Sequence, residues 1–219
     1  MLIFLSKNVD GGFFMINETF LLDTADFIGI ASFALSGFYV ATKDRLDILG
    51  IFIASFLTAL GGGVVRDIIV QKVPFAFLHS YPSLIVVSVL ILSIFFKLHK
   101  SDKILKSNLL VISDSIGLIS FSISGALVAQ NAGFSVFGIS LLAVITATGG
   151  GVMRDILLNK IPLLLVSELY GTISIIVGFS IFVLGFYHMI NFFTISSLFI
   201  LAFIFRLLSY YNKWHLPNL

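Results

Sequence analysis

The 219-residue chain has no cysteine, and only 11% of its residues are Asp, Glu, Lys or Arg. Without cysteine it can form neither a disulfide nor a thiolate metal site. Charged residues normally make up about a quarter of a soluble domain, so the low charge excludes that class. The net charge of +2 is small and does not indicate binding to nucleic acid. The four histidines are scattered without metal-ligand spacing, so we expect neither a metal site nor a cofactor.

The chain is rich in apolar residues, which make up 58% of the sequence. A helix that crosses a membrane needs about 20 of them in succession. Seven stretches meet this requirement, and the short loops between them leave no room for a soluble domain. We therefore predict an all-α membrane protein, a single integral membrane domain over residues 1–219. The predicted transmembrane helices cover residues 20–42, 46–71, 80–98, 108–130, 134–159, 163–186 and 190–211.

The lysines and arginines between these spans predict the orientation in the membrane, because cytoplasmic loops carry the excess of positive charge. One side carries nine of them: Lys43, Arg45, Lys97, Lys100, Lys103, Lys106, Lys160, Arg206 and Lys213. The other side carries Lys7 and Lys72. This bias predicts a multi-pass protein of the cell membrane with its N-terminus outside and its C-terminus in the cytoplasm. The basic loop 97–106 could also contact anionic lipid, although the orientation bias alone explains it.

One motif occurs twice. Gly61–Gly63 is followed by Val64, Val65, Arg66 and Asp67, and Gly149–Gly151 by Val152, Met153, Arg154 and Asp155. The shift is 149 − 61 = 88 residues, and at this shift 22 of the 49 positions in 26–74 and 114–162 are identical. Chance matches in apolar sequence do not align glycines, acids, arginines and a proline together. The chain is therefore an internal duplication.

Each copy contains three predicted spans, so the second copy must cross the membrane in the opposite direction. We predict two inverted three-helix repeats, over about residues 20–98 and 108–186. A seventh helix at about 190–211 lies outside the symmetry, and packing or oligomer contact is its expected role. The glycine triplets fall within the second and fifth spans. Glycine is conformationally free and disfavours a regular helix, so we predict that both helices are broken there.

The triplets have two interpretations. In the first, Gly61, Gly62, Gly63, Gly149, Gly150 and Gly151 form hinges beside a cation path, with freed carbonyl groups facing the ion. In the second, they only allow close helix packing. We favour the hinge.

Acidic and basic residues inside the spans indicate a functional pathway, since such residues are costly in a membrane. Their depths predict two charge clusters. One contains Asp26, Arg66 and Asp67, and the other contains Asp114, Arg154 and Asp155. Four carboxylates face two guanidiniums, a formal charge of −2 that favours cations. The arginine–aspartate pairs have a second interpretation as purely structural clasps.

The doubled Gly-Gly-Gly-x-x-Arg-Asp motif, in two inverted repeats followed by a seventh helix, resembles the prokaryotic branch of the trimeric intracellular cation (TRIC) channels. The resemblance covers about residues 20–210. It implies a homotrimer with a pore in each protomer, lined by the first, second, fourth and fifth helices. It also implies passage of monovalent cations, chiefly K⁺ and also Na⁺. The expected partners are these cations, membrane lipids and further copies of the chain.

A second function remains open, because broken helices in inverted repeats are also a transporter architecture. On this hypothesis the protein is a secondary transporter of a small solute such as glycine, and Arg66 and Arg154 bind its carboxylate. An enzyme has little support, since the sequence contains no intramembrane His-Glu metal motif and no Ser-His or Cys-His pair suited to catalysis.

Overall fold

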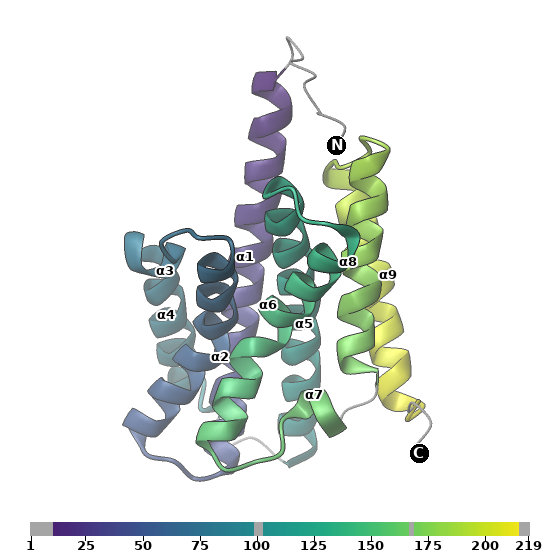
Figure 1. Cartoon of the computed structure of the whole chain (residues 1–219). Coiled ribbons are helices and arrows are strands. Elements are labelled where there is room, and N and C mark those ends of the chain that lie inside the picture. Colours follow the sequence, from purple (N-terminus) through teal and green to yellow (C-terminus); the bar gives the residue numbers. More distant parts are fainter. Residues whose placement is uncertain (1–10, 99–102, 167–168, 215–219) are drawn as a thin grey trace.

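The computed structural model describes residues 11–98, 103–166 and 169–214, and in these residues the chain is helical without strands. Figure 1 shows the helices side by side, with the first described helix beginning at the upper end of the molecule and the last one ending at the lower end. The helices are α1 (Gly11–Lys43), α2 (Ile48–Ile69), α3 (Phe75–Leu78), α4 (Tyr81–Phe95), α5 (Lys103–Asn131), α6 (Val136–Leu157), α7 (Leu163–Val166), α8 (Tyr170–Phe186) and α9 (Phe192–Tyr211).

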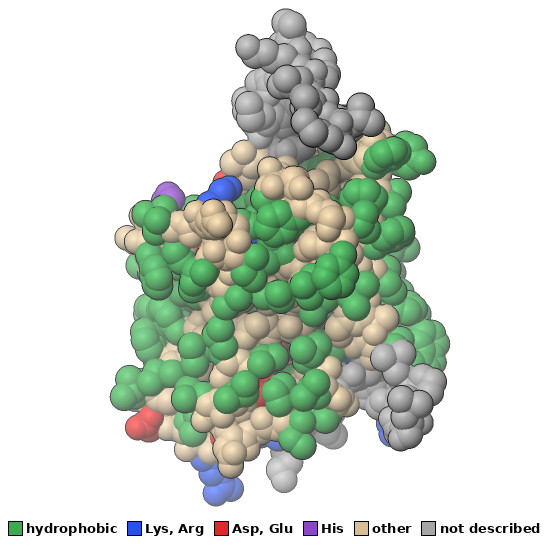
Figure 2. Space-filling view, viewed as in Figure 1, with side chains coloured by type: hydrophobic (Ala, Val, Ile, Leu, Met, Phe, Trp, Pro, Cys, Tyr) green, Lys and Arg blue, Asp and Glu red, His purple; other side chains and the backbone are tan. Residues whose placement is uncertain are grey.

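The lengths and surfaces of these helices are those of a multi-pass membrane protein. Stretches in α1, α2, α5, α6 and α9 are each long and apolar enough to cross a membrane, whereas α4 and α8 are apolar but shorter, with 15 and 17 residues. Large apolar side chains point outward, among them Phe95 and Phe137 at 75% exposure and Phe193 at 80%. Apolar side chains cover most of the face in Figure 2, and many of its lysine and arginine side chains lie toward the lower end.

The duplication is visible in how the helices begin. Asp47 caps α2 by accepting a 2.7 Å hydrogen bond from the Gly50 backbone N–H, and Ser135 caps α6 by accepting a 3.3 Å bond from Gly138. The two capping residues are 135 − 47 = 88 positions apart, so the repeat shift conserves the cap position although the residue differs. A side-chain acceptor at this position satisfies an N–H that the helix cannot bond itself.

Helices α1 and α5 run in opposite directions and pack against each other (Figure 1). Equivalent residues of the two repeats make equivalent contacts across this interface. A Cβ on Gly29 would lie 3.0 Å from the Phe121 ring, and one on Gly117 would lie 2.2 Å from the Phe33 ring. The two rings meet with their centroids 5.3 Å apart. Since Gly117 is Gly29 shifted by 88 positions and Phe121 is Phe33 shifted likewise, each half supplies the same pair to the other.

The prediction that the glycine triplets break their helices is wrong. Both α2 and α6 remain helical through the triplets, although each changes direction along its length in Figure 1. The physical reason is the crossing of these two helices. A Cβ on Gly62 would lie 2.0 Å from the Thr146 carbonyl oxygen, and one on Gly150 would lie 2.2 Å from that of Thr58. Glycine permits this close backbone contact, as small residues do between membrane helices.

The predicted span 163–186 is also wrong as a single helix, because α7 and α8 are separate elements. The short helices α3 and α7 were not predicted as elements. Each follows a proline, Pro74 or Pro162, and each lies directly after one of the two long crossing helices. In Figure 1, α3 and α7 lie toward opposite ends of the molecule. The loop that precedes each therefore turns the chain at one end of the bundle.

Candidate functional site

Arg66 is the centre of the first group of buried charges, which we call the Asp26 cluster: Asp26, Arg66, Asp67 and Ser124. The Arg66 Nη1 atom lies 2.8 and 3.1 Å from the two Asp26 carboxylate oxygens, and Nε lies 2.8 Å from Asp67 Oδ1. The Ser124 hydroxyl also contacts Nη1 and donates to Asp26 at 2.5 Å. All three charged residues are buried, at most 6% exposed. The structure thus brings together the three residues predicted for this cluster.

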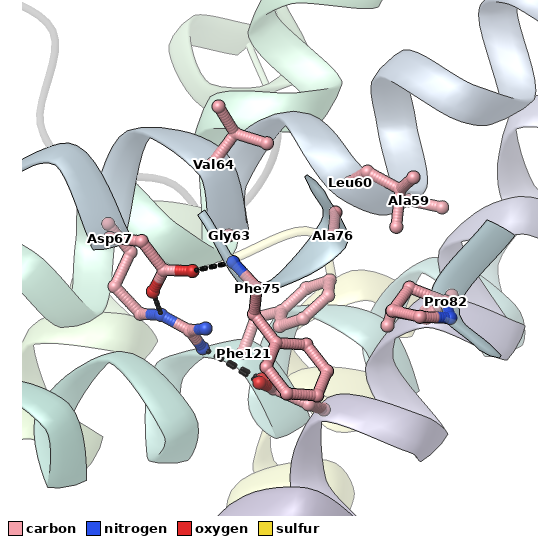
Figure 3. A pocket seen from close by; sticks show the side chains of 12 residues that line it. Ala59, Leu60, Gly63, Val64, Asp67, Phe75, Ala76, Pro82 and Phe121 are labelled. Atoms are coloured by element: carbon pink, nitrogen blue, oxygen red, sulfur yellow. Dashed lines mark hydrogen bonds and ion pairs between the residues drawn. The ribbon is translucent and has the colours of Figure 1, made fainter. Parts of the chain in front are cut away.

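The aspartate of each Arg-Asp pair fastens the loop that follows its helix. Asp67 Oδ1 accepts from Arg66, while Oδ2 accepts the backbone N–H of Phe75, the first residue of α3, at 2.9 Å (Figure 3). In the second half, Asp155 Oδ2 accepts the N–H of Leu163 at 3.1 Å. Both oxygens of each carboxylate are therefore engaged within the fold. These contacts support the second interpretation, in which the arginine–aspartate pairs are structural clasps, and their place beside a cation path stays a prediction.

The second group of charges, the Asp114 cluster, contains Asp114, Arg154, Asp155 and Ser36. The Arg154 Nε atom lies 2.8 Å from Asp155, as in the first half. Its Nη1 atom donates to the Ser36 hydroxyl at 3.4 Å, and that hydroxyl donates to Asp114 at 3.0 Å. The salt bridges between described residues include no pair of Arg154 with Asp114. The predicted triad is assembled here with Ser36 between the arginine and the aspartate.

The serines of the two clusters are equivalent under the duplication, since 124 − 36 = 88. Ser124 of the second half bonds Asp26 of the first, and Ser36 of the first half bonds Asp114 of the second. The predicted clusters did not include these serines. Each serine lies ten residues after the duplicated aspartate of its own helix. This repeated spacing was the signal that could have predicted that each serine bonds the aspartate of the other half.

Two cavities adjoin the Asp26 cluster. The smaller, of about 20 Å³, is lined by residues of α1, α2, α3, α4 and α5, including Asp26 and Arg66 (Figure 3). It is about large enough for a single water molecule. The larger, of about 400 Å³, is lined by Asp23, Lys72 and the charged residues of the cluster. Polar groups of the cluster therefore border space that water or an ion could occupy.

Two further residues lie at the Asp114 cluster. Tyr170, which the predicted cluster did not include, is only 4% exposed and its side chain hydrogen-bonds to Asp114. Arg206 was counted among the loop charges, but it lies within α9 and is 3% exposed. Its guanidinium carbon lies 5.0 Å from the centroid of the Tyr170 ring. The predicted charge of −2 therefore omitted a third buried guanidinium.

The remaining loop charges lie largely where the orientation argument requires. Lys43 is the last residue of α1, and Lys97, Lys160 and Lys213 follow α4, α6 and α9; these four helices end at the same end of the molecule in Figure 1. Lys160 also pairs with Asp44, with 2.5 Å between Nζ and Oδ2. Lys7 and Lys100 lie outside the described residues. The described residues contain no group of three His, Cys, Asp or Glu side chains placed to hold a metal ion.

Comparison with known proteins identifies close relatives in sequence and in structure. The family model described as "Glycine transporter" matches residues 23–100 and 111–186. The UPF0126 membrane protein YvgT of Bacillus subtilis is 36% identical over 194 residues, covering 87% of this chain and 93% of the relative. The UPF0126 inner membrane protein YadS of Escherichia coli K12 is 35% identical over 153 residues, covering 70% of this chain and 73% of the relative.

Solved structures extend the similarity to the fold. A TRIC cation channel studied for its conductance superimposes with a TM-score of 0.77 at 34% identity, covering 90% of this chain and 96% of the other. A prokaryotic TRIC channel crystallised in 0.5 M KCl has a TM-score of 0.81 at 30% identity, covering 90% of this chain and 100% of the other. The TRIC channel orthologue from Rhodobacter sphaeroides has a TM-score of 0.80 at 26% identity, covering 88% of this chain and 98% of the other.

Proposed function

Because this chain belongs to the prokaryotic branch of the TRIC channel family, we propose that it is a cation channel, conducting monovalent cations and chiefly potassium. The observation that carries the proposal is the match to a TRIC cation channel and to a prokaryotic TRIC channel at TM-scores of 0.77 and 0.81 over 90% of the chain. We further propose that seven helices cross the membrane, α4 and α8 among them, as two inverted repeats and a seventh helix. The reciprocal contacts of α1 with α5 and of α2 with α6 support this arrangement.

The proposed path lies inside one protomer, between α1, α2, α5 and α6. It starts in the 400 Å³ cavity and passes the Asp26 cluster, the crossing of the two glycine triplets and then the Asp114 cluster. Gly61–Gly63 and Gly149–Gly151 serve as the hinge in this proposal, through bending of continuous helices. A bend here would change how closely the helix backbones approach, because the triplets are the point of contact. Carboxylates along the path favour cations over anions.

We propose that the functional unit is a homotrimer and that the N-terminus lies outside the cell, which places the Asp26 cluster in the outer half and the Asp114 cluster in the inner half. The excess of lysine at the end of the bundle where α9 ends supports this orientation. The trimer follows from the assembly of a relative, the trimeric intracellular cation channel orthologue of Rhodobacter sphaeroides. Native mass spectrometry of the purified protein would give three times the mass of one chain.

The hypothesis of a glycine carrier is less well supported by the geometry. A carrier would use Arg66 or Arg154 to bind the substrate carboxylate through two parallel N–H bonds. Both arginines already commit Nε to the neighbouring aspartate at 2.8 Å. In Arg66, Nη1 is also committed, to Asp26. At Arg66, a substrate carboxylate would therefore have to displace the carboxylate of Asp26.

Reconstitution in planar bilayers under a KCl gradient tests the proposal. Discrete unitary currents that reverse near the potassium equilibrium potential are expected from a cation channel. Silent bilayers, combined with uptake of labelled glycine into liposomes by the same preparation, would refute the channel and support the carrier. Liposomes without protein serve as the control for both measurements.

A further inference from the structure

The two charge clusters have the same motif but hold their first aspartate differently. Asp26 is bound directly by the Arg66 guanidinium, at 2.8 and 3.1 Å. Asp114 instead accepts from two neutral hydroxyls, those of Ser36 and Tyr170. A carboxylate paired with a guanidinium has its charge balanced locally, whereas one held by hydroxyls keeps a stronger attraction for a passing cation.

Tyr170 lies in the second repeat but contacts α9, the helix that lies outside the duplicated halves. It is the first residue of α8, and its ring is buried in the core that contains Leu118 and Ala147. Arg206 of α9 stands over that ring, with 5.0 Å between the guanidinium carbon and the ring centroid. A guanidinium within about 6 Å of an aromatic face is attracted to it, and the attraction is stronger where water is excluded. Both side chains are nearly inaccessible, at 3% and 4%.

The first half has no such arrangement among the described residues. The residue that opens α4 in the way Tyr170 opens α8 is Tyr81. It is 37% exposed and packs edge-on against Phe75 at 5.1 Å. Arg66 contacts Asp26 directly in the first half, whereas Asp114 of the second half is bonded by a tyrosine that α9 contacts. The two clusters therefore differ in the residues that hold their first aspartate.

We propose that Tyr170 and Arg206 determine how permeating cations use the inner end of the path, with Arg206 as a positioning residue that acts through the Tyr170 ring. The inference rests on the proposed channel function. The Tyr170 hydroxyl occupies an acceptor site on Asp114 that a cation would otherwise use. Arg206, which lies over the Tyr170 ring, holds the ring where its hydroxyl bonds Asp114. Together the two residues reduce the attraction of Asp114 for cations, so they hinder entry of cations from the inner side and not from the outer side.

Currents recorded in symmetric KCl at equal positive and negative voltages test the proposal. Tyr170→Phe removes the hydroxyl and keeps the ring, so cation flow from the inner side should rise relative to flow from the outer side. The expected change in this ratio is about two- to tenfold, the range that follows from the loss of one hydrogen bond. Arg206→Gln should change the ratio in the same direction, and Arg206→Lys should restore much of the wild-type value because it keeps the charge.

Two controls separate this role from a structural one. Tyr81→Phe makes the same chemical change at the first residue of α4, the helix of the first half that corresponds to α8, and should leave the ratio unchanged. Tyr170→Phe combined with Arg206→Gln should give less than the product of the single effects, because both act on the same carboxylate. A purely structural role would instead lower the midpoint of thermal unfolding without moving the current ratio.

The outcomes distinguish the two proposals. If the wild-type protein conducts and Tyr170→Phe leaves the current ratio unchanged, the role of Tyr170 and Arg206 is refuted while the channel stands. A change of equal size in Tyr81→Phe would refute the asymmetry in the same way. A wild-type protein that gives no unitary currents would contradict the channel itself, and with it the inference.

Discussion

The crossing of α2 and α6 gives the sharpest prediction, because neighbouring glycines in one triplet have very different surroundings. A methyl group on Gly62 would lie 2.0 Å from the Thr146 carbonyl oxygen, and one on Gly63 would have its nearest neighbour, the Arg66 Nη2 atom, at 4.0 Å. Carbon and oxygen normally approach no closer than about 3.3 Å, even in a Cα–H···O contact. Gly62→Ala must therefore push the two helices apart by more than about an ångström, whereas Gly63→Ala needs no movement.

The two substitutions share the same gain in helix propensity, about 1 kcal/mol for alanine over glycine. That gain cancels when the variants are compared with each other. What remains is overpacking against a rigid backbone, which costs about 1–3 kcal/mol. We therefore expect Gly62→Ala to be less stable than Gly63→Ala by about 1–3 kcal/mol, or roughly 2–12 °C in Tm. Gly150→Ala should resemble Gly62→Ala, since its Cβ would lie 2.2 Å from the Thr58 carbonyl oxygen.

Fluorescence-detected size exclusion after heating, in one detergent, measures this difference. Gly63→Ala is the matched control, because it makes the same chemical change one residue away. Equal midpoints for Gly62→Ala and Gly63→Ala would refute the close crossing. A separate flux measurement tests the hinge. If Gly63→Ala is stable but conducts less than the wild type, the triplet contributes flexibility as well as close contact.

Three other predictions concern charge and orientation. Asp26→Asn with Asp114→Asn should weaken the preference for cations over anions, and an unchanged reversal potential in a KCl gradient would contradict the role of these carboxylates. Lys160→Gln should lower the free energy of unfolding by no more than about 1 kcal/mol, because its pair with Asp44 is partly exposed; a larger loss in a denaturation series would show otherwise. Val73→Cys, the only cysteine in such a variant, should react with a membrane-impermeant maleimide added outside intact cells, and protection there would reverse the proposed orientation.

Several features of the fold followed from the sequence because they depend on spacing along the chain. The alternating direction of the predicted spans indicated which residues of α2 lie beside which residues of α1, since an arginine late in an ascending helix lies at the depth of an aspartate early in a descending one. The contact of Arg66 with Asp26 is the one that this depth argument predicted. The lengths of the apolar stretches also gave helices close to α2, α5, α6 and α9.

Other features depend on contacts between distant residues, and spacing did not show them. Glycine weakens an isolated helix, so the triplets predicted breaks, but in a membrane the backbone has no water to bond and keeps its internal hydrogen bonds where it can. The close approach of Gly62 to the Thr146 carbonyl, and of Gly150 to that of Thr58, leaves no room for a side chain at these two positions. Arg206 lies in a predicted span, yet its burial depends on α9 packing against its neighbours, which no local pattern reveals.

The differences between the repeats matter more for direction of flow than their similarity does. Two identical inverted halves would make a path that is equivalent from both sides, so any difference between the two directions must come from residues that do not obey the 88-residue shift. Arg206 has no counterpart in the repeats because it belongs to the seventh helix, and Tyr170 bonds the duplicated aspartate only in the second half. A helix added outside the duplication is thus a means by which a symmetric pore can acquire unequal ends. On this proposal, α9 acts at the Asp114 cluster through Arg206, in addition to the packing expected of it.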